Sequence, residues 1–101
     1  MKRLDGRLAL VTGASSGIGL CFCRELASRG CSLVMVSNQD SLYGCAEEIA
    51  SRYGVKAYPL FCDLTAPDCV ETITGFLDGN GLEPDYLLNN AGIFSFRPVT
   101  D

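Results

Sequence analysis

Four short apolar runs alternate with stretches of helical spacing along the chain. The runs cover residues 7–12, 32–37, 56–62 and 85–90, and the helical stretches lie between them. The runs are apolar nearly throughout instead of alternating with polar residues, which is typical of strands buried on both faces of a parallel sheet. The alternation therefore predicts an α/β fold in which helices cover one parallel sheet.

Right-handed crossovers set the expected order of these strands. With three crossover helices, a doubly wound, Rossmann-like sheet takes the strand order 3-2-1-4. The third run then lies at an edge of the sheet. This agrees with Pro59, because proline cannot donate a hydrogen bond to a strand ladder. The fourth run lies at the other edge, where residues 86–88 are apolar and carry no protective charge.

The helices are expected from spacing and from start signals. The pattern predicts one helix from Gly17, a second that follows Asp40 or Ser41 and ends at Gly54, and a third over residues 66–79. Asp40 or Ser41 can cap the second helix, since both side chains accept hydrogen bonds from first-turn N–H groups. Three apolar residues follow one face of the first helix at fourfold spacing: Ile18, Phe22 and Leu26.

Length and charge limit the domain count and the partners. The chain has 101 residues, which suits one small domain, and 48% of them are hydrophobic. The net charge is −4 without a cluster of lysines and arginines, so nucleic acids and anionic membranes are not expected as partners. The first apolar run is too short for a signal peptide or a membrane span, and we expect a cytoplasmic protein.

Six cysteines are spread along the chain: Cys21, Cys23, Cys31, Cys45, Cys62 and Cys69. Without an export signal, a disulfide framework is not expected. A zinc site is not expected either, because the chain has no histidine and no C-x-x-C pair. We expect reduced thiols that pack as small apolar side chains. Redox sensing is the alternative.

The segment LVTGASSGIG, residues 10–19, joins the first strand to the first helix. A helix start offers unpaired N–H groups and a positive dipole end, which a pyrophosphate can use where no side chain intervenes. Gly13 allows the tight exit from the strand, Gly17 lets a phosphate approach the backbone, and Gly19 lets the helix lie close on the sheet. The segment predicts a dinucleotide site. A close-packed turn without a ligand is the alternative, and Ile18 after Gly17 excludes a Walker-A loop.

Three motifs in this order resemble those of the short-chain dehydrogenase/reductase family. They are TGASSGIG at residues 12–19, CDLT at 62–65 and NNAG at 89–92. The resemblance covers nearly the whole chain but only the first, NAD(P)-binding part of the family's domain. It implies a nicotinamide dinucleotide as the partner of these 101 residues. It also implies that the backbone from Gly13 to Gly19, Ile18 included, holds the pyrophosphate, with Ser15 and Ser16 near the adenosine ribose.

The second and third motifs imply contacts to the adenosine half of the cofactor. By the resemblance, Asp63 would accept a hydrogen bond from the adenine amino group, and the backbone of Leu64 would meet the ring. Asn90, Ala91 and Gly92 would line the ribose side. A turn or a helix cap is the alternative role of Asp63, and the asparagines are also expected to tie the fourth strand to its neighbours.

The choice between NAD and NADP depends on the end of the second strand. A carboxylate there would bind the ribose 2′-OH of NAD, and an arginine would favour NADP. The chain has Ser37, Asn38 and Gln39 instead, and none of them repels a 2′-phosphate. Ser37 and Asn38 could donate hydrogen bonds to it. Asp40 is an NAD-type acid by spacing, although its position suits a helix cap. We expect NADP or NAD, with NADP favoured.

No catalytic residue is assigned. The family's hydride transfer, as the resemblance implies, uses a serine and a tyrosine-x-x-x-lysine set, and no tyrosine of this chain precedes a lysine by four positions. We expect residues 1–101 to be the N-terminal fragment of a longer oxidoreductase that interconverts carbonyl and alcohol groups and forms a homo-oligomer. A non-catalytic nucleotide-binding or regulatory module is the alternative. A methyltransferase is disfavoured, because it would need an acid at the end of the second strand.

Overall fold

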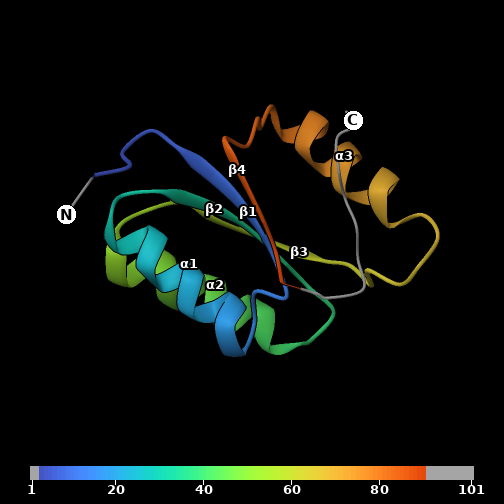
Figure 1. Ribbon diagram of the computed structural model, residues 1–101, viewed down its shortest axis with the longest axis horizontal. Helices are drawn as coiled ribbons and strands as arrows, with labels where there is room; N and C mark the ends of the chain where they lie inside the picture. The colour runs from blue at the N-terminus through green and yellow to red at the C-terminus, as the bar shows by residue number, and fades with distance from the viewer. Residues whose placement is uncertain (1–2, 91–101) are drawn as a thin grey trace.

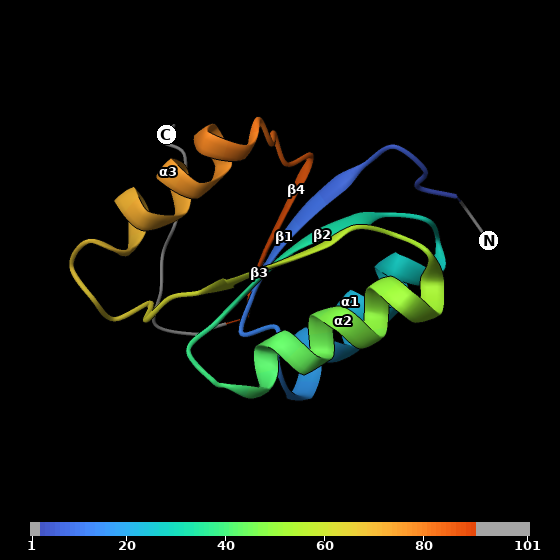
Figure 2. The same ribbon diagram turned by 180° about the vertical axis from the view of Figure 1, so that it is seen from behind.

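A four-stranded parallel sheet separates two helices on one face from a single helix on the other (Figure 1). The computed structural model describes residues 3–90. The strands are β1 (Leu8–Thr12), β2 (Ser32–Ser37), β3 (Ala57–Phe61) and β4 (Tyr86–Asn89), and the helices are α1 (Gly17–Ser28), α2 (Ser41–Tyr53) and α3 (Cys69–Asn80). Figure 2 shows the same arrangement from behind, with α1 and α2 side by side and α3 across the sheet from them.

The strand order is β3-β2-β1-β4, and all three pairings are parallel. This confirms the predicted doubly wound, Rossmann-like order. Thr12 at the end of β1 pairs with Val36 in β2 and with Asn89 in β4, and Ser37 pairs with Phe61 at the end of β3. The strands therefore end at one edge of the sheet, where the loops that follow β1, β2 and β3 meet.

The apolar residues of β1 and β2 face two apolar clusters, and the side alternates along each strand as the pleat requires. One cluster joins α1 and α2 to the sheet through Ala9, Val11, Leu33 and Met35. The other joins α3 to the opposite face, and its buried members are Leu8, Leu10, Val34, Val36, Cys62, Cys69 and Ile73. Burial on both faces explains why β1 and β2 are apolar at nearly every position.

The predicted apolar stripe of α1 is wrong. Ile18 is 69% exposed and Phe22 42% exposed, whereas the buried residues of the helix are Gly19, Cys23 and Ala27. The small residues face the sheet because α1 lies against the turn that follows β1. A Cβ at position 19 would collide with the carbonyl oxygen of residue 13.

The start of α3 and the capping of α2 differ from the prediction. α3 begins at Cys69 rather than at residue 66, because the preceding residues form turns in which Ala66 N–H donates to Asp63 O. Asp40 occupies the N-cap position of α2, but its backbone is helical (φ −61°) and its side chain makes no capping hydrogen bond. The expected capping bond is therefore wrong, although the position is right.

The cysteines pack largely as expected. All six are free thiols, and four of them are buried: Cys23, Cys31, Cys62 and Cys69. Cys45 is partly buried, whereas Cys21 is exposed on the outer side of α1 and does not pack as a core residue. Between residues 3 and 90, no helix combines the length and the apolar character that a membrane crossing requires.

Candidate functional site

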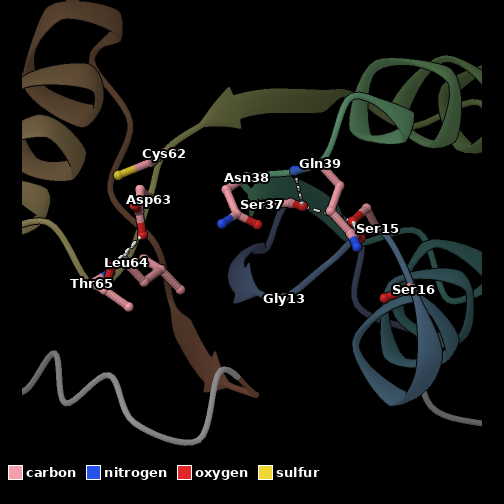
Figure 3. Close-up of a pocket in the computed structure, with 10 residues that line it drawn as sticks. All are labelled: Gly13, Ser15, Ser16, Ser37, Asn38, Gln39, Cys62, Asp63, Leu64 and Thr65. Atoms are coloured by element: carbon pink, nitrogen blue, oxygen red, sulfur yellow. Dashed lines mark hydrogen bonds between the residues drawn. The ribbon is translucent and has the colours of Figure 1, made fainter.

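A cleft of about 260 Å³ opens at the edge of the sheet where the strands end. Its two walls come from the loops after β1 and β2 on one side and from the loop after β3 on the other (Figure 3). Ten residues line it: Gly13, Ser15, Ser16, Ser37, Asn38, Gln39, Cys62, Asp63, Leu64 and Thr65. Asp63 is the one charged side chain in this lining.

The loop after β1 depends on two glycines with left-handed backbone. Gly13 has φ +63° and Gly17 has φ +56°, and other residues adopt such angles only with strain. A Cβ at position 17 would meet nothing within 4 Å, so the space beside this backbone is open to a ligand. Ala14 N–H donates to Val36 O at 3.1 Å, which fixes the loop to β2.

The N-terminus of α1 suits an anion. Ser16 is the N-cap residue in extended conformation, and its side chain makes no capping hydrogen bond. The first turn contains no acidic residue. The N–H groups of the first turn and the positive dipole end therefore meet no competing carboxylate of this helix. Gly17, Ile18 and Gly19 form this helix start and do not line the cleft itself.

Three side chains form a closed group on the first wall. The Ser15 hydroxyl donates to Gln39 Oε1 at 2.5 Å and lies 2.7 Å from the Ser37 hydroxyl. Gln39 N–H donates to Ser37 Oγ at 3.0 Å. Ser15 and Ser37 are buried, whereas Asn38 and Gln39 are exposed. Figure 3 shows the Asn38 side chain pointing away from this group, across the cleft toward Asp63 and Leu64.

Asp63 shapes the second wall. Its Oδ1 accepts a hydrogen bond from the Thr65 hydroxyl at 2.7 Å and another from Thr65 N–H at 2.9 Å. The hydrogen bond from the Thr65 hydroxyl makes the larger contribution and the one from Thr65 N–H the smaller, and together they lower the pKa of the Asp63 carboxyl below its ordinary value. Asp63 is therefore an ionised acceptor in a turn at the mouth of the cleft. The turn that we gave as an alternative role is present, and it uses only one carboxylate oxygen.

The asparagines at the end of β4 contact β1, as expected. The Thr12 hydroxyl donates to Asn89 Oδ1 at 2.9 Å and accepts from Asn90 N–H at 2.9 Å. The Asn90 carbonyl oxygen would lie 3.6 Å from a Cβ at position 13, so the end of β4 runs beside the glycine loop. Asn90 Nδ2 is buried and has no hydrogen-bond partner within the described residues. Ala91 and Gly92 lie outside the described residues.

Three residues of the lining were not predicted. Cys62 and Thr65 belong to the CDLT motif, whose aspartate alone was given a role beside Leu64. Gln39 directly follows Ser37 and Asn38, and nothing in the local sequence marks it as a residue of the site. Only the fold reveals its contact with Ser15, because that contact joins two loops.

Comparisons with known proteins agree with this geometry. The family model described as short chain dehydrogenase matches residues 7–101. The chain belongs to this family. Within the family it is 34% identical to the L-xylo-3-hexulose reductase of Hypocrea jecorina over 113 residues, which covers 96% of this chain and 37% of that protein. The chain thus spans little more than a third of this relative's length.

Solved structures of short-chain dehydrogenases share the fold. The L-sorbose reductase of Gluconobacter frateurii, in complex with NADPH and L-sorbose, has a TM-score of 0.84 at 31% identity over 96% of this chain and 37% of that one. An NAD+-bound xylitol dehydrogenase has a TM-score of 0.75 at 28% identity over 85% of this chain and 33% of that one. Both nicotinamide cofactors therefore occur in relatives of this fold.

Proposed function

We propose that residues 1–101 are the dinucleotide-binding part of a longer short-chain dehydrogenase/reductase. The whole enzyme would transfer hydride between a nicotinamide cofactor and a carbonyl or alcohol group. The proposal rests on one observation. The N-terminus of α1 has neither a capping side chain nor an acidic residue in its first turn, and it adjoins the cleft at the edge where the parallel strands end. Ligands of doubly wound sheets bind at this edge.

The residues present fit such a cofactor. The backbone from Gly13 to Gly19 would hold the pyrophosphate, because the open space at Gly17 leaves its N–H groups accessible. Ser16 and the Ser15–Ser37 pair lie on the same wall and would border the adenosine ribose.

The opposite wall would receive the adenine. Asp63 uses Oδ1 for Thr65, so Oδ2 is the oxygen that would accept from the adenine amino group. The backbone of Leu64 would meet the ring. Asn90, with Ala91 and Gly92 after it, would line the ribose side where β4 ends.

The cofactor that we propose is NADP rather than NAD. The lining residues at the end of β2 are Ser37, Asn38 and Gln39, and no carboxylate among them would repel a 2′-phosphate. Asp40 is exposed at the start of α2 and is absent from the lining. The NADPH complex of the L-sorbose reductase supports this choice, whereas the NAD+ complex of the xylitol dehydrogenase shows that the fold also takes the other cofactor.

The bound dinucleotide would supply the hydride chemistry, and this chain would hold and orient it. The chain contains no tyrosine-x-x-x-lysine set. We propose that the catalytic residues and the substrate pocket belong to the remainder of a longer, cytoplasmic, homo-oligomeric protein. A non-catalytic nucleotide-binding module is the alternative. The coding sequence after residue 101 decides between them, since a downstream Tyr-x-x-x-Lys supports the enzyme and a stop codon supports the module.

Calorimetric titration of the chain with NADPH, NADH and S-adenosylmethionine tests the binding proposal. NADPH is expected to bind more tightly than NADH, and S-adenosylmethionine is expected not to bind. In the control variant Gly17→Val, a side chain fills the open space beside the helix start, so nucleotide binding should be lost. Equal binding by the folded variant would contradict the proposed phosphate site.

A further inference from the structure

The last residue of α3 and the glycine after it form the one Asn-Gly pair of the chain, Asn80 and Gly81. In such a pair the backbone nitrogen of the glycine can attack the side-chain amide carbon of the asparagine, because glycine has no Cβ to obstruct the approach. A bond forms between this nitrogen and Cγ, and ammonia leaves with the proton that the nitrogen loses. Water then opens the resulting succinimide ring to aspartate or to isoaspartate. The reaction needs no other reagent.

The attacking nitrogen is held in the hydrogen bonds that end α3. Gly81 has left-handed backbone (φ +64°), and its N–H donates to Asp78 O at 3.2 Å. The N–H of the next residue, Leu82, donates to Leu77 O at 2.9 Å. These two bonds form a Schellman motif, which a glycine in this conformation allows. While the motif is intact, the glycine nitrogen is engaged and does not reach Cγ of Asn80.

The side chain of Asn80 is exposed to solvent but is tied back along the helix. Its NH₂ group donates to the Phe76 carbonyl oxygen at 2.8 Å. Leu82, which follows the glycine, packs with Phe76 against the apolar cluster on the α3 face of the sheet. Opening of the last turn releases these hydrogen bonds and withdraws Leu82 from the cluster, and such local openings require far less free energy than unfolding of the whole chain.

We propose that Asn80 is a deamidation site and that opening of the Schellman motif at the end of α3 controls its reaction. Isoaspartate at position 80 lengthens the backbone inside the motif by one methylene, so the N–H groups of Gly81 and Leu82 lose alignment with their carbonyl partners. Either product replaces the NH₂ group that donates to Phe76 with a carboxylate, which is unfavourable at the negative end of the helix dipole. The modification therefore loosens the end of α3.

Peptide mapping by mass spectrometry, after incubation of the chain in warm, mildly alkaline buffer, tests the site. In guanidinium, where no helix end remains, Asn80 should exchange its NH₂ group for OH at least about tenfold faster than Asn38 or Asn89, since neither is followed by glycine. Without denaturant, the reaction at Asn80 should be at least about tenfold slower than in guanidinium. Equal rates at Asn80 and Asn38 in guanidinium would overturn the inference, and so would equal rates at Asn80 with and without denaturant.

Leu82→Ala separates opening of the helix end from unfolding of the chain. The variant removes the contact between the motif and the α3 cluster, so Asn80 should deamidate at least about threefold faster in the folded variant and at an unchanged rate in guanidinium. The control Leu26→Ala removes a partly buried leucine on the opposite face of the sheet and should leave the rate at Asn80 within about twofold.

Circular dichroism and thermal unfolding check that both leucine variants fold. Equal acceleration by the two variants would mean that general loss of stability controls the reaction, which would overturn the role of the Schellman motif. An unchanged rate in folded Leu82→Ala would overturn it as well. Because the reaction involves only this chain and water, these outcomes do not depend on the proposed dinucleotide function.

Discussion

The face of the sheet under α1 and α2 is buried more completely than the face under α3. On the first face, Val11, Leu33 and Met35 are fully buried. On the second, Ile73 is also fully buried, but Leu87 of β4, which pairs with Leu10 in the sheet, remains 38% exposed. The loop after β1 and the hydrogen-bonded group of Ser15, Ser37 and Gln39 adjoin the first face, whereas the Asp63 turn precedes α3. One wall of the cleft thus adjoins a closed core, and the other adjoins a partly open one.

A matched pair of isoleucines tests this comparison with the largest expected effect. Ile49 in α2 and Ile73 in α3 are both fully buried. We expect Ile49→Ala to lower the free energy of unfolding by about 4 kcal/mol and Ile73→Ala by about 2 kcal/mol, because the partly buried residues packed around Ile73 can move into the space left behind. Urea unfolding at neutral pH measures both values. Equal losses would contradict the difference between the faces.

Close packing of α1 on the glycine loop gives the second prediction. A Cβ at position 19 would collide with the backbone carbonyl of Gly13, so Gly19→Ala should lower the free energy of unfolding by about 3 kcal/mol. Gly17→Ala is the control: its Cβ meets open space and only the positive φ is strained, so about 1 kcal/mol is expected. If Gly19→Ala lowers the free energy of unfolding in urea no more than Gly17→Ala does, the close packing of α1 against the loop after β1 does not stabilise the fold.

Alkaline pH probes the burial of thiols on the two faces. Burial, with a smaller contribution from Cys45, raises the pKa of Cys23 to about 12, and burial also raises the pKa of Cys62. Above the ordinary thiol pKa of about 9, the unfolded chain loses the Cys23 proton while the folded chain keeps it. The free energy of unfolding therefore falls with rising pH by about 1.4 kcal/mol per unit, or about 2 kcal/mol by pH 10.5.

Cysteine variants assign this alkaline loss to one face. Relative to the unmodified chain, Cys23→Ala should remove most of the difference between urea unfolding at pH 7.5 and pH 10.5. Cys62→Ala should remove less, since Cys62 is 7% exposed and Cys23 is fully buried. A larger effect of Cys62→Ala than of Cys23→Ala would mean that the thiol on the α3 face is the more completely buried of the two.

Exposed helical glycines give the smallest expected effect, and here the two faces should agree. Gly44 in α2 and Gly75 in α3 have no positive φ, and a Cβ added at either position would meet open space. Gly44→Ala and Gly75→Ala should each raise the free energy of unfolding by about 0.5–1 kcal/mol, because alanine loses less backbone entropy in a helix. Urea unfolding measures both gains. A gain from one variant only would show that α2 and α3 differ in helix stability as well as in core burial.

Much of the fold follows from local sequence. Apolar runs indicated the buried strands, and Pro59 placed β3 at an edge. The buried stripe of α1 was missed, because apolar character does not tell how closely a helix approaches a sheet. Cys23 and Ala27 are buried there instead of Ile18, since only small residues fit the close approach.

The part of the candidate site that depends on backbone N–H groups could be predicted from the sequence. Glycines between a strand and a helix of a βαβ unit predict a phosphate site, with a close-packed turn as the alternative, and the structure brings Gly13 together with Ser37 and Asp63 in one cleft. The bond between Gln39 and Ser15 could not be predicted. It joins side chains from two loops 24 positions apart, and their distance depends on the register of β1 against β2.

Titration of the isotope-labelled chain with NADPH, followed by amide NMR shifts, tests the central claim most directly. We expect the largest shifts on both walls of the cleft, at residues 13–19, 37–39 and 62–65. The amide signals of the residues that line a separate hollow on α2 should not shift; these are Gly44, Glu47, Glu48, Ser51 and Arg52. Shifts centred on that hollow, or no shifts around Gly17 at saturating NADPH, would contradict the account.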